Sequence, residues 1–320
     1  MNLAIPTHHP VMYNKRKEFL DCLEYLICSY IQGFGVPYHW LLSDRWGFYY
    51  RSIDDFTAAK EEVLIPFPGT LQKIYKAEFL HYEKRELLDV VKETISQNRQ
   101  LFTVVDGRFF PWYTDMEIFS HFVLIQDYDS ASKLFYITDL WPYEFSDWFP
   151  IEPTKQAYEV EGRYSFTLTE PSLQISKELL QQQFRSVCDK ITGTDPGYEG
   201  YLSGQKALLA CQQDMILHGK DLGIHLDKIF DMLKRVINYR DGFLEFVLYA
   251  DQDQTSPVHN EIDPALITLV EETVNIWAVF RNYLIKAKVT GSTTFQKQID
   301  WVDKIIEKEK EVYEKLTTYF

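Results

Sequence analysis

The stretch SHFVLIQDYDSASKLFYITD, residues 120–139, carries the clearest structural signal in the sequence. Two runs rich in β-branched and aromatic residues, Phe122–Tyr128 and Leu134–Thr138, predict two β-strands. The polar segment Asp127–Lys133 between them is typical of a turn, so we expect the strands to pair as an antiparallel hairpin. This hairpin predicts an antiparallel sheet in the first half of the chain.

The two halves of the sequence show different patterns. Between about residues 34 and 170, the runs Leu101–Val105 and Tyr164–Thr169 predict further strands, and residues 150–162 predict a connecting loop. After Pro171, apolar residues recur every three or four positions, which predicts helices. The predicted helices are Leu173–Lys190, Leu202–Leu217, Leu222–Tyr239, Gly242–Ala250, Pro264–Lys288 and Phe295–Thr318. We therefore expect an α+β fold, with a mixed domain at residues 1–165 and an all-helical domain at residues 166–320.

The amino-acid composition and charge of the chain argue against several classes of function. Lys and Arg number 33 against 47 Asp and Glu, giving a formal net charge of −14, which argues against a nucleic-acid binder and a polybasic membrane-surface protein. The first ten residues do not form a signal peptide, and no apolar run approaches a membrane span, so we expect a cytoplasmic protein. Four cysteines without a C-x-x-C pair do not indicate a disulfide scaffold, and no His/Cys cluster predicts a metal. Aromatic residues are abundant, at 16%.

A cysteine stands near the start of an apolar helical pattern that ends at Gly33. Asp21 and Glu24 have the form of a capping box, which would make Cys22 the first residue of the helix. There the helix dipole and the unpaired backbone N–H groups favour a thiolate, and the same N–H groups could stabilise an oxyanion. The alternative is that the helix begins earlier, at about Lys15, and that Cys22 is a small buried residue.

A nucleophilic thiol needs a base and an orienting group. Among the eight histidines, His121 is distinctive because it opens the first strand of the hairpin, and Asp139 closes the second. Strand pairing would bring the carboxylate near the imidazole, where it could select the tautomer. The alternative for Asp139 is a solvated side chain in the turn that follows.

The order of Cys22, His121 and Asp139 resembles that of the papain-like fold of C39-type peptidases, and more specifically the butirosin biosynthesis protein H family. The segments that carry the resemblance are Cys22 with Gly33–Gly35, Trp46–Tyr50, Val105–Trp112, His121–Asp129 and Tyr136–Asp139, with weaker matches at Ser203–Leu209 and Tyr239–Leu244. The resemblance implies a papain-like catalytic domain followed by a helical domain. It also implies a cysteine acyltransferase that moves an aminoacyl group from a carrier-protein thioester to an amine of an antibiotic.

Two features depart from the pattern of the papain-like relatives. Those proteins place an oxyanion-binding Gln a few residues before the cysteine, whereas residues 14–21 contain none, so the backbone N–H of Cys22 is the candidate donor. Asp139 is followed by Leu-Trp-Pro rather than directly by Pro. A non-catalytic assembly or binding protein that keeps the fold is therefore one alternative function. Hydrolysis of a thioester or a peptide by the same three residues is the other.

Further residues are assigned around the expected site. The aromatic segments and one arginine are expected to bind the acceptor amine and exclude water. These residues are Trp46, Tyr49, Tyr50, Arg108, Phe110, Trp112 and Tyr113. A basic island in this acidic chain, Lys15, Arg16 and Lys17, is expected to attract an acidic acyl or peptidyl carrier protein, whose phosphopantetheine arm would present the thioester. No other cofactor is expected, and the charged C-terminal helix makes a homodimer a reasonable expectation.

Overall fold

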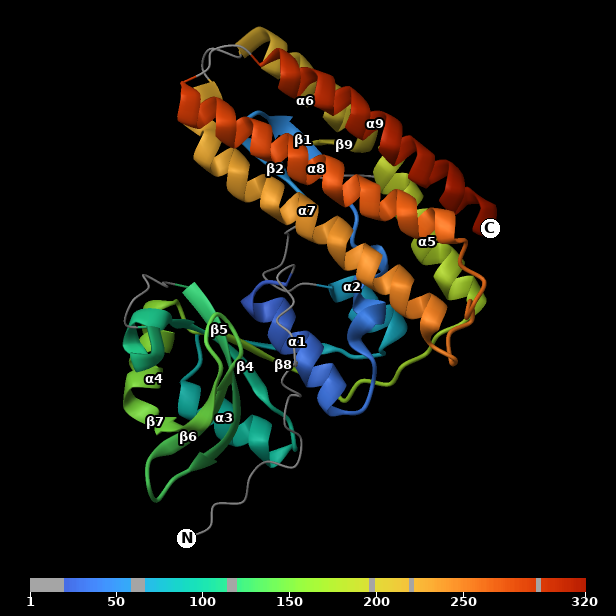
Figure 1. Ribbon diagram of the computed structural model, residues 1–320. Coiled ribbons are helices and arrows are strands. Elements are labelled where there is room, and N and C mark those ends of the chain that lie inside the picture. Colours follow the sequence, from blue (N-terminus) through green and yellow to red (C-terminus); the bar gives the residue numbers. More distant parts are fainter. Residues whose placement is uncertain (1–19, 59–66, 114–119, 196–198, 219–221, 292–294) are drawn as a thin grey trace. The chain divides into compact units, whose positions relative to one another are not determined.

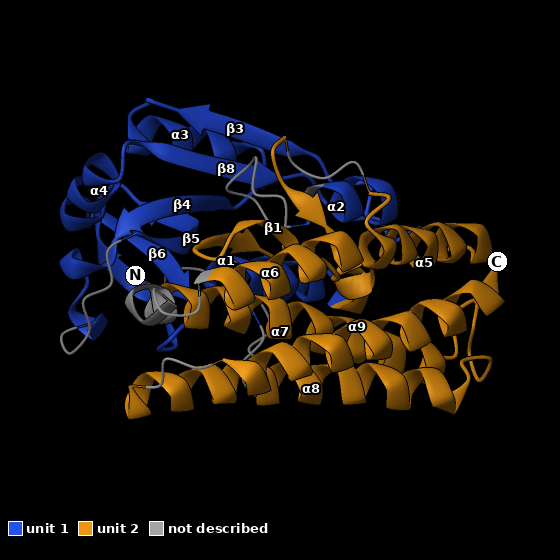
Figure 2. Ribbon diagram, turned by 90° about the horizontal axis from the view of Figure 1, so that it is seen from above, with its two compact units in different colours: residues 1–38, 65–174 blue, residues 39–64, 175–320 orange. Residues whose placement is uncertain are grey.

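The structure is a computed structural model that describes residues 20–58, 67–113, 120–195, 199–218, 222–291 and 295–320. The described residues form two compact units (Figure 2). The first unit takes its residues from 1–38 and 65–174, and the second from 39–64 and 175–320. The chain thus begins in the first unit, enters the second unit at residue 39, returns to the first at residue 65 and ends in the second from residue 175. Segment 39–64, which we assigned to the first domain, belongs to the second unit.

The first unit is built on a six-stranded sheet with the order β3-β8-β4-β5-β6-β7, in which every neighbouring pair is antiparallel. Its strands are β3 (Phe79–Glu83), β4 (Leu101–Asp106), β5 (Ser120–Asp129), β6 (Leu134–Asp139), β7 (Phe145–Pro150) and β8 (Tyr164–Leu168). Its helices are α1 (Cys22–Gly33), α2 (Pro68–Ile74), α3 (Leu87–Ser96) and α4 (Ile151–Val160). The mixed helix and sheet content and the antiparallel sheet are as predicted. Figure 1 labels these elements apart from β3, which Figure 2 labels.

The hairpin expected at residues 120–139 is present as β5 and β6, with Leu124 opposite Thr138 and Ile125 opposite Ile137. Side chains alternate between the two faces of a strand. Val123 and Ile137 therefore point to one face, where they share a core cluster with Val90 of α3 and Ala157 of α4. Both faces of the central strands are buried, which explains why β5 reads as a continuous apolar run.

Helix α1 packs on the opposite face of the sheet. Tyr30 of α1 lies edge-on to Phe102 of β4, with ring centroids 5.4 Å apart, and its hydroxyl donates a hydrogen bond of 3.3 Å to the carbonyl of Leu168 on β8. These contacts fix α1, and with it Cys22, relative to the sheet.

One sequence prediction in this unit is wrong. Residues 150–162 were expected to be a loop, but Ile151–Val160 form helix α4. Pro150 is the N-cap residue and Pro153 lies in the first turn, where a missing backbone N–H disturbs no helical hydrogen bond. The two prolines that suggested a loop therefore mark a helix start.

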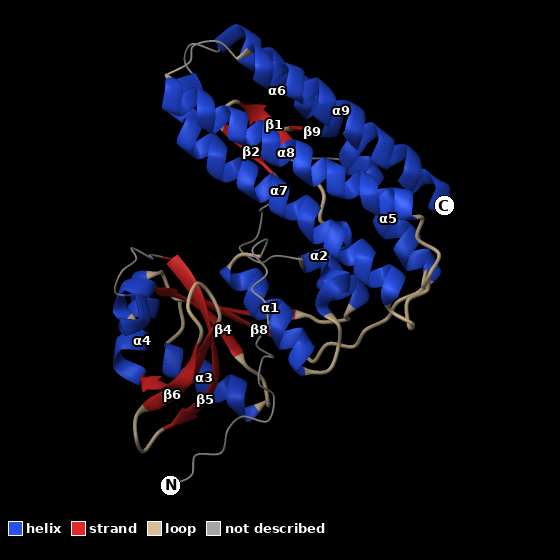
Figure 3. Ribbon diagram, in the orientation of Figure 1, coloured by secondary structure: helices blue, strands red, loops and turns tan. Residues whose placement is uncertain are grey.

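The second unit is mainly helical, as Figure 3 shows by colour. Its helices are α5 (Lys177–Thr192), α6 (Gly204–His218), α7 (Leu222–Gln252), α8 (Pro264–Thr290) and α9 (Gln296–Leu316), and its small antiparallel sheet has the order β2-β1-β9 (Asp55–Thr57, Tyr49–Ser52 and Leu202–Ser203). The helices expected at 222–239 and 242–250 are one helix. A Cβ atom on Gly242 would lie 2.9 Å from Cδ of Arg45. The glycine therefore allows Arg45 to pack closely against the helix and does not end the helix. Within the described residues, no helix is long and apolar enough to cross a membrane.

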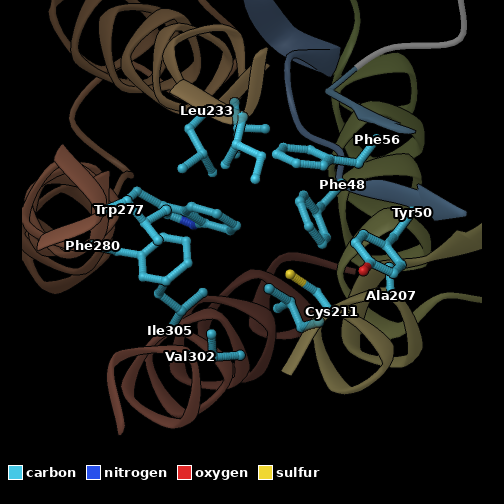
Figure 4. Close-up of a cluster of buried hydrophobic side chains, with 14 of the residues drawn as sticks. Phe48, Tyr50, Phe56, Ala207, Cys211, Leu233, Trp277, Phe280, Val302 and Ile305 are labelled. Carbon is cyan, nitrogen blue, oxygen red and sulfur yellow. The ribbon is translucent and has the colours of Figure 1, made fainter. Parts of the chain in front are cut away.

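The inserted segment 39–64 supplies part of the core of the second unit. Phe48, Tyr50 and Phe56 pack in one cluster with Trp277 and Phe280 of α8 (Figure 4). The Phe48 carbonyl accepts a hydrogen bond of 3.0 Å from the backbone N–H of Gly204, at the start of α6. The helical unit thus takes part of its core from Tyr50 of β1 and Phe56 of β2.

Candidate active site

Helix α1 begins at Cys22, as the capping pattern predicted. Asp21 is the N-cap residue: its Oδ1 accepts a hydrogen bond of 2.8 Å from the N–H of Glu24, and its own N–H donates to Glu24 Oε2 at 3.0 Å. Asp21 has an extended backbone conformation, so the alternative of a continuous helix from about Lys15 is wrong. Cys22 is partly exposed, whereas the other three cysteines are buried.

The capping box leaves two backbone donors beside the thiol. The N–H of Glu24 bonds to the Asp21 side chain, and the N–H of Tyr25 makes the first helical hydrogen bond, to the Asp21 carbonyl. The N–H groups of Cys22 and Leu23 have no acceptor within the helix, because both lie in its first turn. They are positioned to stabilise negative charge that develops next to the sulfur.

His121 links the thiol to a carboxylate. It is 1% exposed, its Nε2 lies 3.0 Å from Oδ1 of Asp139, and its side chain is hydrogen-bonded to that of Cys22. Because Nε2 is engaged by Asp139, Nδ1 is the ring nitrogen left for the thiol. The structure therefore brings Cys22, His121 and Asp139 into one chain of hydrogen bonds, from α1, β5 and β6.

The charge state of His121 follows from its surroundings. Burial lowers the pKa of the imidazole, but the hydrogen bonds to Asp139 and Cys22, together with the charges of both groups, outweigh burial and raise the pKa to about 10. His121 is thus an imidazolium at neutral pH, next to the Cys22 sulfur. The thiolate is the nucleophilic form of cysteine, and an imidazolium in this position is the charge that a thiolate nucleophile needs beside it.

Asp139 is fully buried, so the alternative of a solvated turn residue is wrong. Its Oδ1 accepts from His121 and, at 3.2 Å, from the backbone N–H of Trp141. Its Oδ2 accepts from Nε1 of Trp112 at 3.1 Å and from the hydroxyl of Tyr113. These four donors occupy both carboxylate oxygens and fix the orientation of the Asp139 side chain.

Aromatic rings surround the imidazole. The Tyr113 ring lies edge-on to that of His121, with centroids 5.3 Å apart, and the Trp141 ring stacks on it at 6.2 Å. Phe110, one of the expected acceptor-binding residues, is buried and packs on Trp112 at 4.8 Å. These rings keep water away from the His121–Asp139 pair.

Arg108 braces the turn that carries these aromatic residues. Its guanidinium donates from both Nε and Nη2 to the fully buried Asp106, and its backbone N–H donates to the same carboxylate at 3.0 Å. Hydrogen bonds from Arg108 hold the pKa of Asp106 below its ordinary value. The Arg108 side chain is about half exposed, so the guanidinium that pairs with Asp106 is also accessible to solvent.

The other aromatic residues expected to bind the acceptor lie in the second unit. Trp46 is 1% exposed and packs edge-on to Phe243, at 5.4 Å. Tyr49 and Tyr50 are also buried, and their hydroxyls donate to Asp195 at 2.8 Å and to Asp214 at 2.7 Å. These three side chains are buried in the interior of the second unit.

Lys15, Arg16 and Lys17 lie outside the described residues. Among the other thiols, burial raises the pKa of Cys188 to about 12 and raises the pKa of Cys211 further still. Both are therefore thiols of low reactivity, whereas Cys22 interacts with His121.

Comparisons with known proteins add little. No family model matches the chain, and no curated protein matches it. One solved structure, a C39-like peptidase from Bacillus anthracis, aligns with a TM-score of 0.27 and 16% identity, over 33% of this chain and 58% of that chain. The match thus spans less than two thirds of the peptidase, and at that TM-score it defines neither the family nor the reaction of this chain.

Proposed function

We propose that the protein is a cysteine-dependent acyltransferase with a papain-like first unit. It would take an acyl or aminoacyl group from a carrier-protein thioester and transfer it to an amine, as in nonribosomal peptide, polyketide or aminoglycoside-type biosynthesis. The observation that supports this proposal is the hydrogen-bonded series of Cys22 at the start of α1, His121 and the buried Asp139. The resemblance of the sequence segments around these residues to the butirosin biosynthesis protein H family supports the acyl-transfer assignment.

In the first half-reaction, the Cys22 thiolate attacks the thioester carbonyl carbon and forms a new C–S bond. The N–H groups of Cys22 and Leu23 donate to the oxyanion of the tetrahedral intermediate. The intermediate collapses with cleavage of the bond to the phosphopantetheine sulfur, which takes the proton from the His121 imidazolium. The products are acyl-Cys22, neutral His121 and a free carrier thiol.

In the second half-reaction, the acceptor amine attacks acyl-Cys22 while neutral His121 takes the amine proton. The amide forms, the Cys22 sulfur leaves as a thiolate, and the imidazolium is regenerated beside it. Asp139 keeps His121 in the required tautomer and orientation through both halves. The same intermediate would be hydrolysed if water reached it, and the buried aromatic surroundings of His121 support transfer over hydrolysis.

The decisive experiment is intact-mass detection of the acyl-enzyme. The protein is incubated with an aminoacyl thioester on a carrier protein and with the matching pantetheine thioester. We expect a mass increase equal to the acyl group, located on Cys22 by fragmentation, absent in Cys22→Ala and retained in Cys28→Ala, whose cysteine is buried in the same helix. Failure to acylate with either thioester would contradict the proposal and favour a binding role.

A second measurement separates transfer from hydrolysis. Candidate amines are added to the acylated protein, and amide and free acid are quantified. Amide formation supports the transferase, and free acid alone identifies a thioesterase or peptidase that uses the same residues.

The proposed carrier partner has its own test. Reversal of the charges of Lys15, Arg16 and Lys17 should weaken acylation from the carrier protein and leave acylation from the small pantetheine thioester unchanged, because only the carrier offers an acidic surface. Unchanged kinetics with the carrier at low ionic strength would remove the basic island from the proposal.

A further inference from the structure

The turn after β4 folds back onto the Cys22–His121–Asp139 series. β4 and β5 pair with Val105 opposite His121, so the chain leaves β4 next to the imidazole. Asp106 caps the short 3₁₀ turn Gly107–Phe109, and a second 3₁₀ turn, Pro111–Tyr113, follows directly. The backbone N–H of Tyr113 donates to the carbonyl of Phe110 at 3.2 Å. The turn is thus held at both its ends by hydrogen bonds.

This turn delivers two adjacent side-chain donors to one carboxylate oxygen. Trp112 Nε1 lies 3.1 Å from Oδ2 of Asp139, and the Tyr113 hydroxyl donates to the same oxygen while lying 3.2 Å from the Trp141 carbonyl oxygen. Burial and the nearby Asp139 charge raise the pKa of Tyr113 above its ordinary value, so the hydroxyl keeps its proton. Both residues belong to the aromatic segment expected to bind the acceptor amine, but the N–H of Trp112 and the O–H of Tyr113 are donated to Asp139 instead.

We propose that Trp112 and Tyr113 are positioning residues that act on His121 through Asp139, and that they do not recognise the acceptor. Oδ1 must face Nε2 of His121 for Nδ1 to face Cys22, and two donors on Oδ2 prevent the carboxylate from turning away. They also replace the hydrogen bonds to water that the Asp139 carboxylate loses on burial. This inference rests on the proposed function only in assuming that the thiolate–imidazolium pair is the working form.

The ring contacts support the assignment to positioning. The Trp112 ring stacks on Phe145 of β7 at 3.8 Å, nearly parallel at 10°, and also packs on Phe149 and Phe110. Tyr113 belongs to the core cluster of the first unit and is 2% exposed. Both rings are therefore fixed by packing before any substrate arrives, which is what a group that orients another group requires.

The test uses a small neutral reagent that needs no acceptor site. The rate of Cys22 carboxamidomethylation by iodoacetamide is measured from pH 4 to 10, with modification located on Cys22 by fragment mass. We expect Tyr113→Phe to move the acid limb of the rate profile to higher pH and to slow the reaction at neutral pH about tenfold, as expected for the loss of a hydrogen bond to a charged group. Trp112→Phe, which keeps an aromatic ring against Phe145, should do the same.

Tyr30→Phe is the matched control, because its hydroxyl is buried in the same unit and donates to a backbone carbonyl instead of Asp139. It should leave the profile unchanged, and circular dichroism confirms that all three variants are folded. Profiles of Tyr113→Phe and Trp112→Phe that superimpose on wild type, or that move to lower pH, would overturn the inference while leaving the proposed function intact. A wild-type Cys22 that reacts no faster than a free peptide cysteine at neutral pH would instead contradict the proposed function and this inference with it.

Discussion

Arg240 on α7 and Glu309 on α9 form a fully buried ion pair in the second unit. The guanidinium donates from Nε at 2.9 Å and from Nη2 at 2.6 Å to Glu309 Oε1, which also accepts from Trp277 Nε1 at 2.9 Å. The remaining nitrogen, Nη1, donates to the Gly47 carbonyl at 2.9 Å. One guanidinium thus connects two helices with the inserted segment 39–64.

Removal of one partner of this pair should destabilise the second unit strongly. Glu309→Leu leaves a guanidinium buried without its counter-charge, for which the expected loss is about 3–5 kcal/mol of unfolding free energy. The double variant Arg240→Met, Glu309→Leu should recover part of that loss, because no charge then remains buried. Urea unfolding, followed by the helical circular dichroism signal, gives the unfolding free energy of Glu309→Leu, Arg240→Met and the double variant. A loss in the double variant equal to the sum of the losses in the two single variants would contradict the expectation.

Gly47 should be intolerant of a side chain. A Cβ atom there would lie 2.3 Å from the carbonyl oxygen of Ala58, closer than van der Waals contact permits. Gly47→Ala should therefore lower the unfolding free energy by about 1–3 kcal/mol, the range of overpacking substitutions. Gly69→Ala is the control: a Cβ atom at this position in α2 meets nothing within 4 Å, so the substitution should be neutral or slightly stabilising. If thermal unfolding showed the same loss of unfolding free energy for Gly47→Ala and Gly69→Ala, the steric explanation would be wrong.

The proton on His121 should make stability depend on pH. The pKa of His121 is raised from 6.5 to about 10 in the folded chain, so the folded state binds this proton more tightly than the unfolded state. The resulting stabilisation is fully present below pH 6.5 and is lost as pH rises toward 10. The unfolding free energy of wild type relative to His121→Gln should therefore shrink over that interval. His81→Gln, on an exposed position of β3, is the comparison, and a difference that stays constant or grows with pH would be inconsistent with the raised pKa.

Substitutions along the Cys22–His121–Asp139 series should affect acyl transfer in a graded way. His121→Ala removes the proton donor and acceptor and should lower the transfer rate by about 10²–10⁴-fold, the usual contribution of general acid–base catalysis. Asp139→Asn keeps the shape of the side chain but not its charge, so the loss should be smaller than that of His121→Ala. Single-turnover transfer from a pantetheine thioester measures both rates. An Asp139→Asn enzyme as active as wild type would remove the carboxylate from the mechanism.

The local parts of this structure were predictable from the sequence because their signals lie within a few residues. The capping box at Asp21 and Glu24 sets the start of α1, and alternation of side chains sets the β5–β6 hairpin that carries His121 and Asp139. Both features depend on backbone hydrogen bonds between near neighbours in the sequence. The hairpin brings His121 and Asp139 together, and the packing of α1 on the sheet then brings Cys22 to them.

The parts that were missed depend on partners far apart in the chain. Nothing near Trp112 indicates that its indole N–H bonds to a carboxylate on β6, and its aromatic neighbours suggested a binding surface instead. Nothing near residues 49–52 indicates that β1 pairs with β9, which lies far along the chain and meets β1 only in the folded structure. Likewise, Leu222–Tyr239 and Gly242–Ala250 were expected to be two helices, because the close approach of Gly242 to Arg45, nearly two hundred residues away, is visible only in the folded chain.

The division of the chain between the two units has a consequence for biosynthesis. Segment 39–64 emerges from the ribosome before most of the first unit, yet Tyr49 pairs with Ser203, and Phe48 packs on Trp277. The first unit can close as soon as residue 174 has emerged, while β1 and β2 still lack the helices and the strand that cover them. During that interval the nascent polypeptide displays unpaired strand edges and large aromatic side chains, which are the groups that chaperones bind and that lead to aggregation. The yield of folded protein in a cell should therefore depend on how quickly residues 175–320 follow.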